Sequence, residues 1–244
     1  MNKKIQLKYL IFIFASLINS GCNAAKSDIK PYFNTNNQSA AFFEKPVVVG
    51  SAKDFLAIRE KAWDFPTDLK HKKLGQKTVS NCLILNKLIN EGFTAAKAYD
   101  HAFVNAQSTI CSMWELMGEF KSYNVSFMDK LRLNKDFSAQ VPAQFALLIS
   151  NDDIKKAASA ASWDDASKIK DVKSLNDEQA TYYDRSESIQ RLTLMAKGDY
   201  NADGVEDRLL YMENSVEGGS YSSAKAYIIT RITANGPIVL LKEF

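Results

Sequence analysis

The chain has 244 residues, the length of one ordinary domain or of one domain with appendages. Its 46% hydrophobic and 24% charged residues can form a sizeable core, and ten Gly, five Pro and three Cys exclude a collagen-like, a low-complexity or a disulfide-dense chain. The formal net charge is +3. However, Lys3, Lys4 and Lys8 lie in a segment that we expect to be removed, and 31 basic residues less these three leave 28, against 28 acidic residues. A neutral mature chain argues against a nucleic-acid-binding protein.

The N-terminus has the layout of a secretory signal peptide. Lysines within residues 1–8 precede the apolar run YLIFIFASLI at residues 9–18, and a basic segment followed by a short apolar one is typical of such signals. The run is shorter than the roughly 20 residues that a membrane-spanning helix needs. We therefore predict a signal peptide over residues 1–21.

The tripeptide Ser-Gly-Cys at residues 20–22 follows the apolar run. It resembles the lipobox of bacterial lipoproteins, although Asn19 stands where that family usually has Leu. The resemblance covers about the first 22 residues and implies that Cys22 is acylated and anchors the chain in a membrane. Because Asn23 is not Asp, the resemblance further implies an outer-membrane lipoprotein that faces the periplasm. The alternative is ordinary cleavage at the alanines 24–25, which would remove Cys22.

Residues 22–45 would then comprise the lipidated cysteine and a tether. They are polar and Asn-rich, without a clean periodicity. The aromatic pairs Tyr32-Phe33 and Phe42-Phe43 are unusual in a linker, which leaves open that they dock onto the folded body.

Either processing route leaves Cys82 and Cys111. An exported protein meets oxidising conditions, so an even pair of cysteines predicts a disulfide. Closing a loop of about 30 residues would stabilise the fold by about 3.5 kcal/mol on the chain-entropy model. The alternative is two buried free thiols.

Residues 46–186 are predicted to form a mainly helical region. Two of its helices would form a helical hairpin that the disulfide joins. In chain order we expect a short strand at 47–49, a helix capped by Ser51 that ends before Pro66, a basic connector at 67–77, helices at 80–90 and from Thr94 to Gly118, a helical patch at 127–133, a helix at 152–161 capped by Asn151, and a polar surface connection at 162–186.

The pattern changes after Glu187 to short apolar runs that predict strands at 189–196, 208–213, 224–233 and 238–242. Asn235-Gly236 between the last two is a strong hairpin signal. The sequence therefore predicts an α+β fold, in which an N-terminal helical part with a helical hairpin precedes a C-terminal four-stranded antiparallel meander over 187–244. We expect residues 46–244 to form one compact domain.

Residues 199–207, between the first two predicted strands, have the pattern D-x-N-x-D-G-x-x-D. Oxygen side chains at alternate positions, with a glycine for the sharp turn, suit a hard cation such as calcium. Over these nine residues the chain resembles the calcium loops of EF-hands, dockerins and integrin-type repeats. The resemblance implies a structural ion held by the side chains of Asp199, Asn201, Asp203 and Asp207 and by the carbonyl of Val205.

The loop departs from an EF-hand at position twelve, where Leu210 replaces the bidentate Glu, and its flanks are strand-like. We therefore expect a calcium site between two strands. The alternative is a hairpin loop in which Asn, Asp and Gly only form the turn.

The sequence offers no catalytic motif. It contains two histidines, His71 and His101, and none of the patterns GxSxG, HExxH, GxxxxGK[ST] or GxGxxG. Acidic pairs at 152–153 and 164–165 could serve a glycosidase, but solvated helix caps are the simpler interpretation.

These features favour a lipid-anchored, exported, non-enzymatic protein that binds another protein of the cell envelope, in an inhibitor-like, immunity-like or accessory role. Its partners would be that protein and, through the N-terminal lipid, the membrane, with no nucleic acid. The alternatives are a carboxylate-dependent envelope hydrolase and a structural accessory of an outer-membrane assembly.

Overall fold

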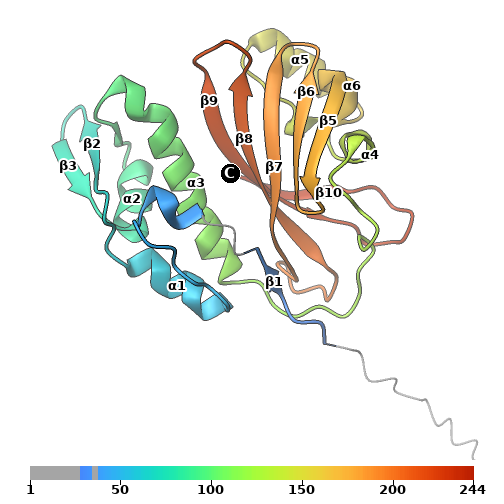
Figure 1. Cartoon of the computed structure of the whole chain (residues 1–244), viewed down its shortest axis with the longest axis horizontal. Helices are drawn as coiled ribbons and strands as arrows, with labels where there is room; N and C mark the ends of the chain where they lie inside the picture. Colours follow the sequence, from blue (N-terminus) through green and yellow to red (C-terminus); the bar gives the residue numbers. More distant parts are fainter. Residues whose placement is uncertain (1–27, 35–37) are drawn as a thin grey trace, which may run out of the picture.

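The computed structural model describes residues 28–34 and 38–244. Cys22 and the predicted signal peptide lie outside these residues. The predicted four-stranded meander is wrong, because the described residues form a seven-stranded antiparallel sheet and a separate three-stranded sheet. Figure 1 shows helices on both sides of the large sheet. The small sheet interrupts the predicted helical part in sequence.

Helices occur along much of the described chain up to residue 167. The α-helices are α1 (Ala52–Glu60), α2 (Cys82–Asn90), α3 (His101–Met117), α4 (Lys135–Gln140), α5 (Asn151–Ser159) and α6 (Trp163–Ser167), and the short 3-10 helices are η1 (Gln38–Ala41), η2 (Ala98–Asp100) and η3 (Ala143–Phe145).

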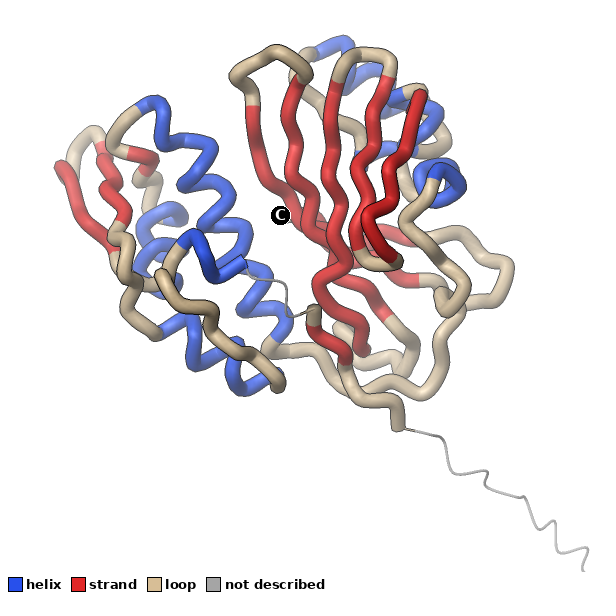
Figure 2. The backbone as a smooth tube through the Cα atoms, in the orientation of Figure 1, coloured by secondary structure: helices blue, strands red, loops and turns tan. Residues whose placement is uncertain are grey.

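The two sheets are visible as the red segments of Figure 2. The large sheet has the order β10-β9-β8-β7-β6-β5, with β1 added beside β7, and the small sheet has the order β3-β2-β4. The strands are β1 (Tyr32–Phe33), β2 (Thr67–His71), β3 (Gly75–Val79), β4 (Thr94–Ala95), β5 (Ile169–Asn176), β6 (Gln179–Asp184), β7 (Ser188–Gly198), β8 (Asp207–Val216), β9 (Ser222–Thr230) and β10 (Val239–Glu243).

The central strand β8 is buried on both faces, and this explains the continuous apolar run at residues 209–212 in its middle. Side chains of a strand alternate between the two faces of a sheet. Leu209 and Tyr211 therefore join the core formed with α1, α2 and α3, whereas Leu210 and Met212 join a second core on the other face. Helices of that second layer lie behind the sheet in Figure 1, which makes the body a three-layer arrangement.

The predicted basic connector at 67–77 is instead the hairpin β2–β3. Thr67 and Leu69 are buried while the residues between and after them are exposed or half-exposed, which is the alternation of a strand. The sequence did not indicate a strand here, because Leu69 is the one strongly apolar residue of β2. His71 Nδ1 accepts hydrogen bonds from the backbone N–H groups of Lys73 and Leu74 (3.1 Å each) and so closes the turn.

The predicted surface connection at 162–186 contains α6, β5 and β6. Ala180, Tyr182 and Asp184 of β6 face the core in strict alternation with half-exposed residues. The sequence pattern did not indicate a strand, because two of these three buried positions carry a small residue, Ala180, and an acid, Asp184. Strand β5 forms an edge of the sheet, and its mostly exposed polar residues gave no apolar periodicity.

Several smaller expectations also differ from the structure. Residues 47–49 and 127–133 form neither the predicted strand nor the predicted helix. Thr94 does not cap a helix but begins β4, and α3 starts seven residues later, at His101. Helix α5 is capped by Ser150, whose Oγ accepts from the backbone N–H of Asp153 (3.1 Å), rather than by Asn151.

Part of the predicted tether belongs to the folded body. Tyr32 and Phe33 form β1 on the edge of β7, and the side chains of Phe42 and Phe43 are buried in the core beside α3. Phe42 packs against Trp114 with ring centroids 5.1 Å apart. The docking of both aromatic pairs is therefore confirmed.

Candidate functional site

The predicted calcium loop, residues 199–207, joins β7 to β8 at one end of the large sheet. It lies against the segment that follows α3. Lys121 and Asp199 exchange backbone hydrogen bonds (3.0 and 2.8 Å), and the backbone N–H of Val125 donates to the carbonyl of Gly204 (3.3 Å). The loop is therefore held from both sides, by the sheet and by residues 121–125.

The approach of that segment requires glycine at position 198. A Cβ atom there would lie 2.8 Å from Phe120 Cδ1 and 3.0 Å from the carbonyl oxygen of Lys121. Gly204 has a positive φ of 79°, a left-handed conformation that favours glycine. Gly198 thus allows the loop to pack closely against Phe120 and Lys121, and Gly204 allows the sharp turn of the loop.

Polar side chains of the loop accept hydrogen bonds from its own backbone. Asp199 Oδ1 and Oδ2 accept from the N–H groups of Asp203 (3.2 Å) and Gly204 (2.8 Å), and Asp203 Oδ1 accepts from Val205 N–H (2.8 Å). Asn201 Oδ1 also accepts from Asp203 N–H (3.1 Å). These bonds hold the oxygens of three predicted ligands around one turn, and a carboxylate oxygen that accepts one hydrogen bond retains a further lone pair.

Asp207 differs from the other acids of the loop because it is fully buried, at 0% exposure. Its Oδ2 accepts from the N–H of Tyr200 (2.8 Å), and the carboxyl also interacts with the hydroxyl of its cross-strand neighbour Thr230. Thr230 is itself only 2% exposed, so the carboxyl and the hydroxyl are buried together. Burial raises the pKa of the Asp207 carboxyl above its ordinary value, and the negative charge of Asp203 adds to the rise.

A buried carboxylate is costly unless a proton or a cation compensates its charge. The donor set of carboxylate, amide and carbonyl oxygens suits calcium. In the described part of the chain, no group of three or more His, Cys, Asp or Glu side chains is arranged to hold a metal ion as it stands. The structure thus brings the predicted ligands into one loop, and calcium binding there would require their side chains to turn toward a common centre.

Beside the loop lies a buried ion pair that the sequence analysis missed. Glu206 and Arg208 are 1% and 6% exposed, and Arg208 Nε donates to Glu206 Oε1 (2.6 Å). The Arg208 guanidinium also donates to the backbone carbonyls of Met128 and Leu131. Burial and the charge of Glu206 raise the pKa of Tyr123 to about 12. This ion pair and its hydrogen bonds hold residues 123–131 in a non-helical conformation. The helix predicted at 127–133 therefore does not form there.

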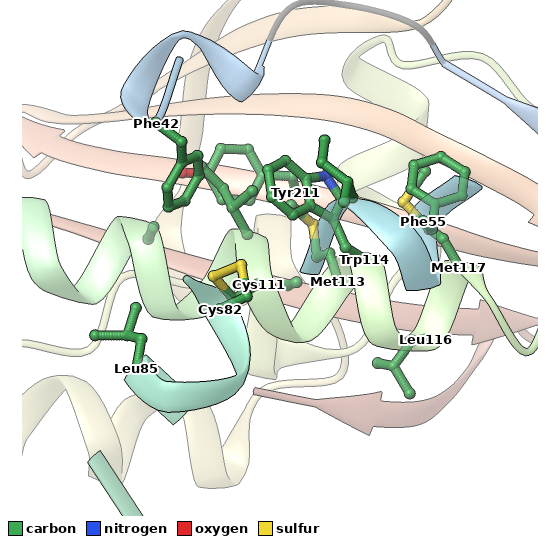
Figure 3. Close-up of a cluster of buried hydrophobic side chains, with 14 of the residues drawn as sticks. Phe42, Phe55, Cys82, Leu85, Cys111, Met113, Trp114, Leu116, Met117 and Tyr211 are labelled. Carbon is green, nitrogen blue, oxygen red and sulfur yellow. A yellow bond between two sulfur atoms is a disulfide. The ribbon is translucent and has the colours of Figure 1, made fainter. Parts of the chain in front are cut away.

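The predicted disulfide between Cys82 and Cys111 is confirmed, with its two Cα atoms 5.2 Å apart. It joins the first turn of α2 to the middle of α3, and both cysteines are fully buried. Figure 3 shows it among side chains of the core such as Phe42, Leu85 and Met113. Disulfides of this kind are typical of exported proteins.

A groove opens between the N-terminal half of α3 and the ends of β7, β8 and β9. We call this cavity of about 350 Å³ the α3 groove. Asn105 Oδ1 accepts from the backbone N–H of Ala224 (2.7 Å) and holds α3 against β9 at this groove. The groove is lined by Ala102, Phe103, Ala106, Ile189, Arg191, Tyr211, Glu213, Asn214, Ser215, Ser222, Ser223 and Ala224.

The α3 groove combines apolar and polar walls. Phe103 is 45% exposed, whereas Tyr211 is only 4% exposed. Arg191 Nη1 lies 3.7 Å from Glu213 Oε2, an exposed ion pair across two strands. No local sequence pattern pointed to this groove, since its walls come from segments about 80 to 120 residues apart.

Several residues considered for catalysis have structural roles in a turn or a helix cap. His71 closes the β2–β3 turn, and His101 is exposed at the start of α3. Asp153 and Asp165 belong to helix caps, where hydrogen bonds from Ser150 and from the Lys168 ammonium respectively are the largest causes that lower the pKa of each carboxyl.

Within residues 28–34 and 38–244, no helix combines the length and the apolar character that crossing a bilayer requires. The chain matches no protein-family model, and neither a curated protein nor a solved structure matches it significantly.

Proposed function

We propose that this chain is an exported, lipid-anchored and non-enzymatic protein that binds another envelope protein in the α3 groove. The observation that carries the proposal is the groove itself, which is open, rimmed by the half-exposed Phe103 and floored by the buried Tyr211. A cavity of about 350 Å³ suits one or two anchoring side chains of a partner. Such buried anchors commonly supply most of the binding energy of a protein interface.

The composition of the groove supports a protein partner. Apolar side chains from α3 face a polar strand surface that carries serines, Asn214 and the pair Arg191–Glu213. Aromatic side chains and arginine are enriched in protein interfaces. The neighbouring turn, residues 217–221, contributes Gly, Ser and a 38% exposed Tyr221, residue types that adaptable binding surfaces use.

We also propose that Cys22 carries the lipid anchor and that the loop 199–207 binds calcium in a structural role. The disulfide supports export, and the fully buried carboxyl of Asp207, whose charged form a cation would stabilise, supports an ion in the loop. The ligands would be the side chains of Asp199, Asn201, Asp203 and Asp207 and the carbonyl of Val205. The loop lies at the end of the sheet opposite the groove, which is why we assign the ion to stability rather than to partner binding.

The proposal is tested by affinity capture with crosslinking of the tagged mature chain from its own cell envelope. We compare Phe103→Glu in the groove with Ile154→Glu on α5, because both side chains are about half exposed (45% and 52%) and tolerate a charge. A stoichiometric partner that is captured by the wild type and by Ile154→Glu, but not by Phe103→Glu, is the expected result. A partner retained equally by both variants, or no specific partner, would overturn the proposal.

The activity of the captured partner then separates the inhibitor-like role from the accessory role. An inhibitor or immunity protein lowers the activity of a purified envelope hydrolase or toxin in a dose-dependent way. An accessory remains bound in a larger assembly and leaves the activity of its partner unchanged.

A further inference from the structure

The described chain begins at the end of the large sheet that carries the loop 199–207. Ile29 exchanges backbone hydrogen bonds with Tyr123 (2.8 and 3.0 Å), and β1 pairs with the last residues of β7. Residues 28–33 are therefore fastened to the body, and we call them the arm. In Figure 1 the arm lies at the bottom of the sheet, where β1 is labelled.

The α3 groove lies at the opposite end of the same strands. Strand β8 runs for ten residues from Asp207, beside the arm, to Val216, near the groove. At about 3.4 Å per residue this separation is about 30 Å. Tyr221, in the turn that follows β8, is at the groove end.

The inference rests on the proposed lipid anchor at Cys22. Five residues separate Cys22 from Asp28, the first residue that the structure describes. Six residue steps span at most about 20 Å even when fully extended. The tether therefore spans less than the length of the sheet, about 20 Å against about 30 Å. The arm is held close to the bilayer surface, whereas the groove end can lie farther from it.

The surface around the arm has the composition that a membrane interface accepts. Ile29, Tyr32 and Val125 are 40%, 39% and 39% exposed, and Lys30 and Lys121 are exposed beside them. Val125 belongs to this surface because Tyr123, two residues earlier, pairs with Ile29. Apolar side chains with lysines around them suit the headgroup region, where the lysines can extend toward phosphate groups.

We propose that the membrane-facing surface of the anchored protein consists of Ile29, Lys30, Tyr32, Lys121 and Val125. We call this surface the arm end. The α3 groove then points away from the bilayer. The occupant of the arm end is a phospholipid surface held there by the lipid on Cys22. Asp28 and Asp203 are also exposed in this region and offset the lysines. Contact therefore depends on the anchor and on apolar side chains more than on net charge. The partner in the groove would accordingly approach from the aqueous side.

The test uses the full lipidated chain in vesicles of phosphatidylethanolamine and phosphatidylglycerol. A fluorophore is attached to Ile29→Cys or to Tyr221→Cys, two positions of nearly equal exposure (40% and 38%) at opposite ends of the sheet. We expect a quencher fixed to lipid headgroups to quench the probe at position 29 several-fold more strongly than the probe at position 221. Val125→Cys provides a second reporter at the arm end, in case labelling at position 29 disturbs the arm.

Flotation of the same vesicles separates the two proposals. Chains that float with equal quenching at both ends, or with stronger quenching at position 221, would overturn the orientation but not the anchor. Chains that carry no lipid and do not float would overturn both.

Discussion

Replacing Asp207 by Asn is expected to abolish the stabilisation by calcium. In the wild type the carboxyl is fully buried, accepts from Tyr200 N–H (2.8 Å) and interacts with the Thr230 hydroxyl. Burial disfavours its charged form, which is why its pKa is raised. An Asn side chain can still accept from Tyr200 N–H through Oδ1 and donate to Thr230 Oγ1 through Nδ2, without a charge to bury. Above the raised pKa and without calcium, we therefore expect Asp207→Asn to be more stable than the wild type by about 1–3 kcal/mol.

Calcium should stabilise the wild type and leave Asp207→Asn nearly unchanged. A ligand at about 100 times its Kd stabilises the folded state by about 2.7 kcal/mol. For a body of about 200 residues, this corresponds to a rise in Tm of about 5–10 °C, at about 2–4 °C per kcal/mol. Thermal unfolding with chelator and with excess calcium measures both effects. Asp177→Asn, whose side chain is 86% exposed and outside the loop, is the matched control.

The pH dependence adds an independent check. Because the folded protein raises the pKa of Asp207, the carboxyl favours the fold while protonated, and this contribution is lost as the pH rises from about 4 through the raised pKa. In chelator, the stability of the wild type relative to Asp207→Asn should therefore fall as the pH rises over this range. A wild-type Tm that ignores calcium, together with a variant that is less stable in chelator, would refute the reasoning.

Three further predictions follow from individual contacts. Replacing both Cys82 and Cys111 by Ala should lower the free energy of unfolding by about 3.5 kcal/mol, as measured by denaturant titration, and reduction should then leave that double variant unaffected. Gly198→Ala should cost about 1–3 kcal/mol because its Cβ meets a backbone oxygen at 3.0 Å, whereas Gly50→Ala, with its nearest atom 4.0 Å away, should be nearly neutral in the same titration; equal losses would contradict the close approach. Cys22→Ser should abolish incorporation of labelled palmitate, and continued labelling would exclude this cysteine as the anchor.

Local patterns in the sequence predicted the elements whose signals are local. Ser51 caps α1 as expected, in a capping box with Asp54, and α2 ends at Asn90 as expected. The strands after Glu187 were found because their buried positions carry large apolar side chains. Caps and apolar periodicity depend on neighbours within a few residues, so they can be recognised without the tertiary structure.

The missed elements have buried positions that the residue types conceal. Strand β2 buries Leu69 but otherwise consists of polar residues, and β6 buries Ala180 and Asp184 beside a single large side chain, Tyr182. Their pairing partners, not their own composition, make them strands. The same limit applies to the whole sheet, whose burial depends on helices from earlier in the chain, α1 to α3 on one face and α4 and α6 on the other.

The two candidate sites differ in the same way. The ligands of the loop 199–207 lie within nine residues, so their pattern was visible in the sequence, but the burial of Asp207 depends on strand pairing with β9. The α3 groove could not be predicted, because Phe103 and Glu213 meet only when α3 packs beside the sheet. The apolar residues of α3 indicated a buried helix but not which strands it would pack against.

The most direct test of the central claim places a photoreactive amino acid at single positions of the anchored chain in living cells. We predict a crosslink to one envelope protein from the position of Phe103 in the α3 groove, and none from the equally exposed position of Ile154 on α5. A crosslink to the same protein from both positions, or from position 154 alone, would contradict the proposal that the groove is the binding surface.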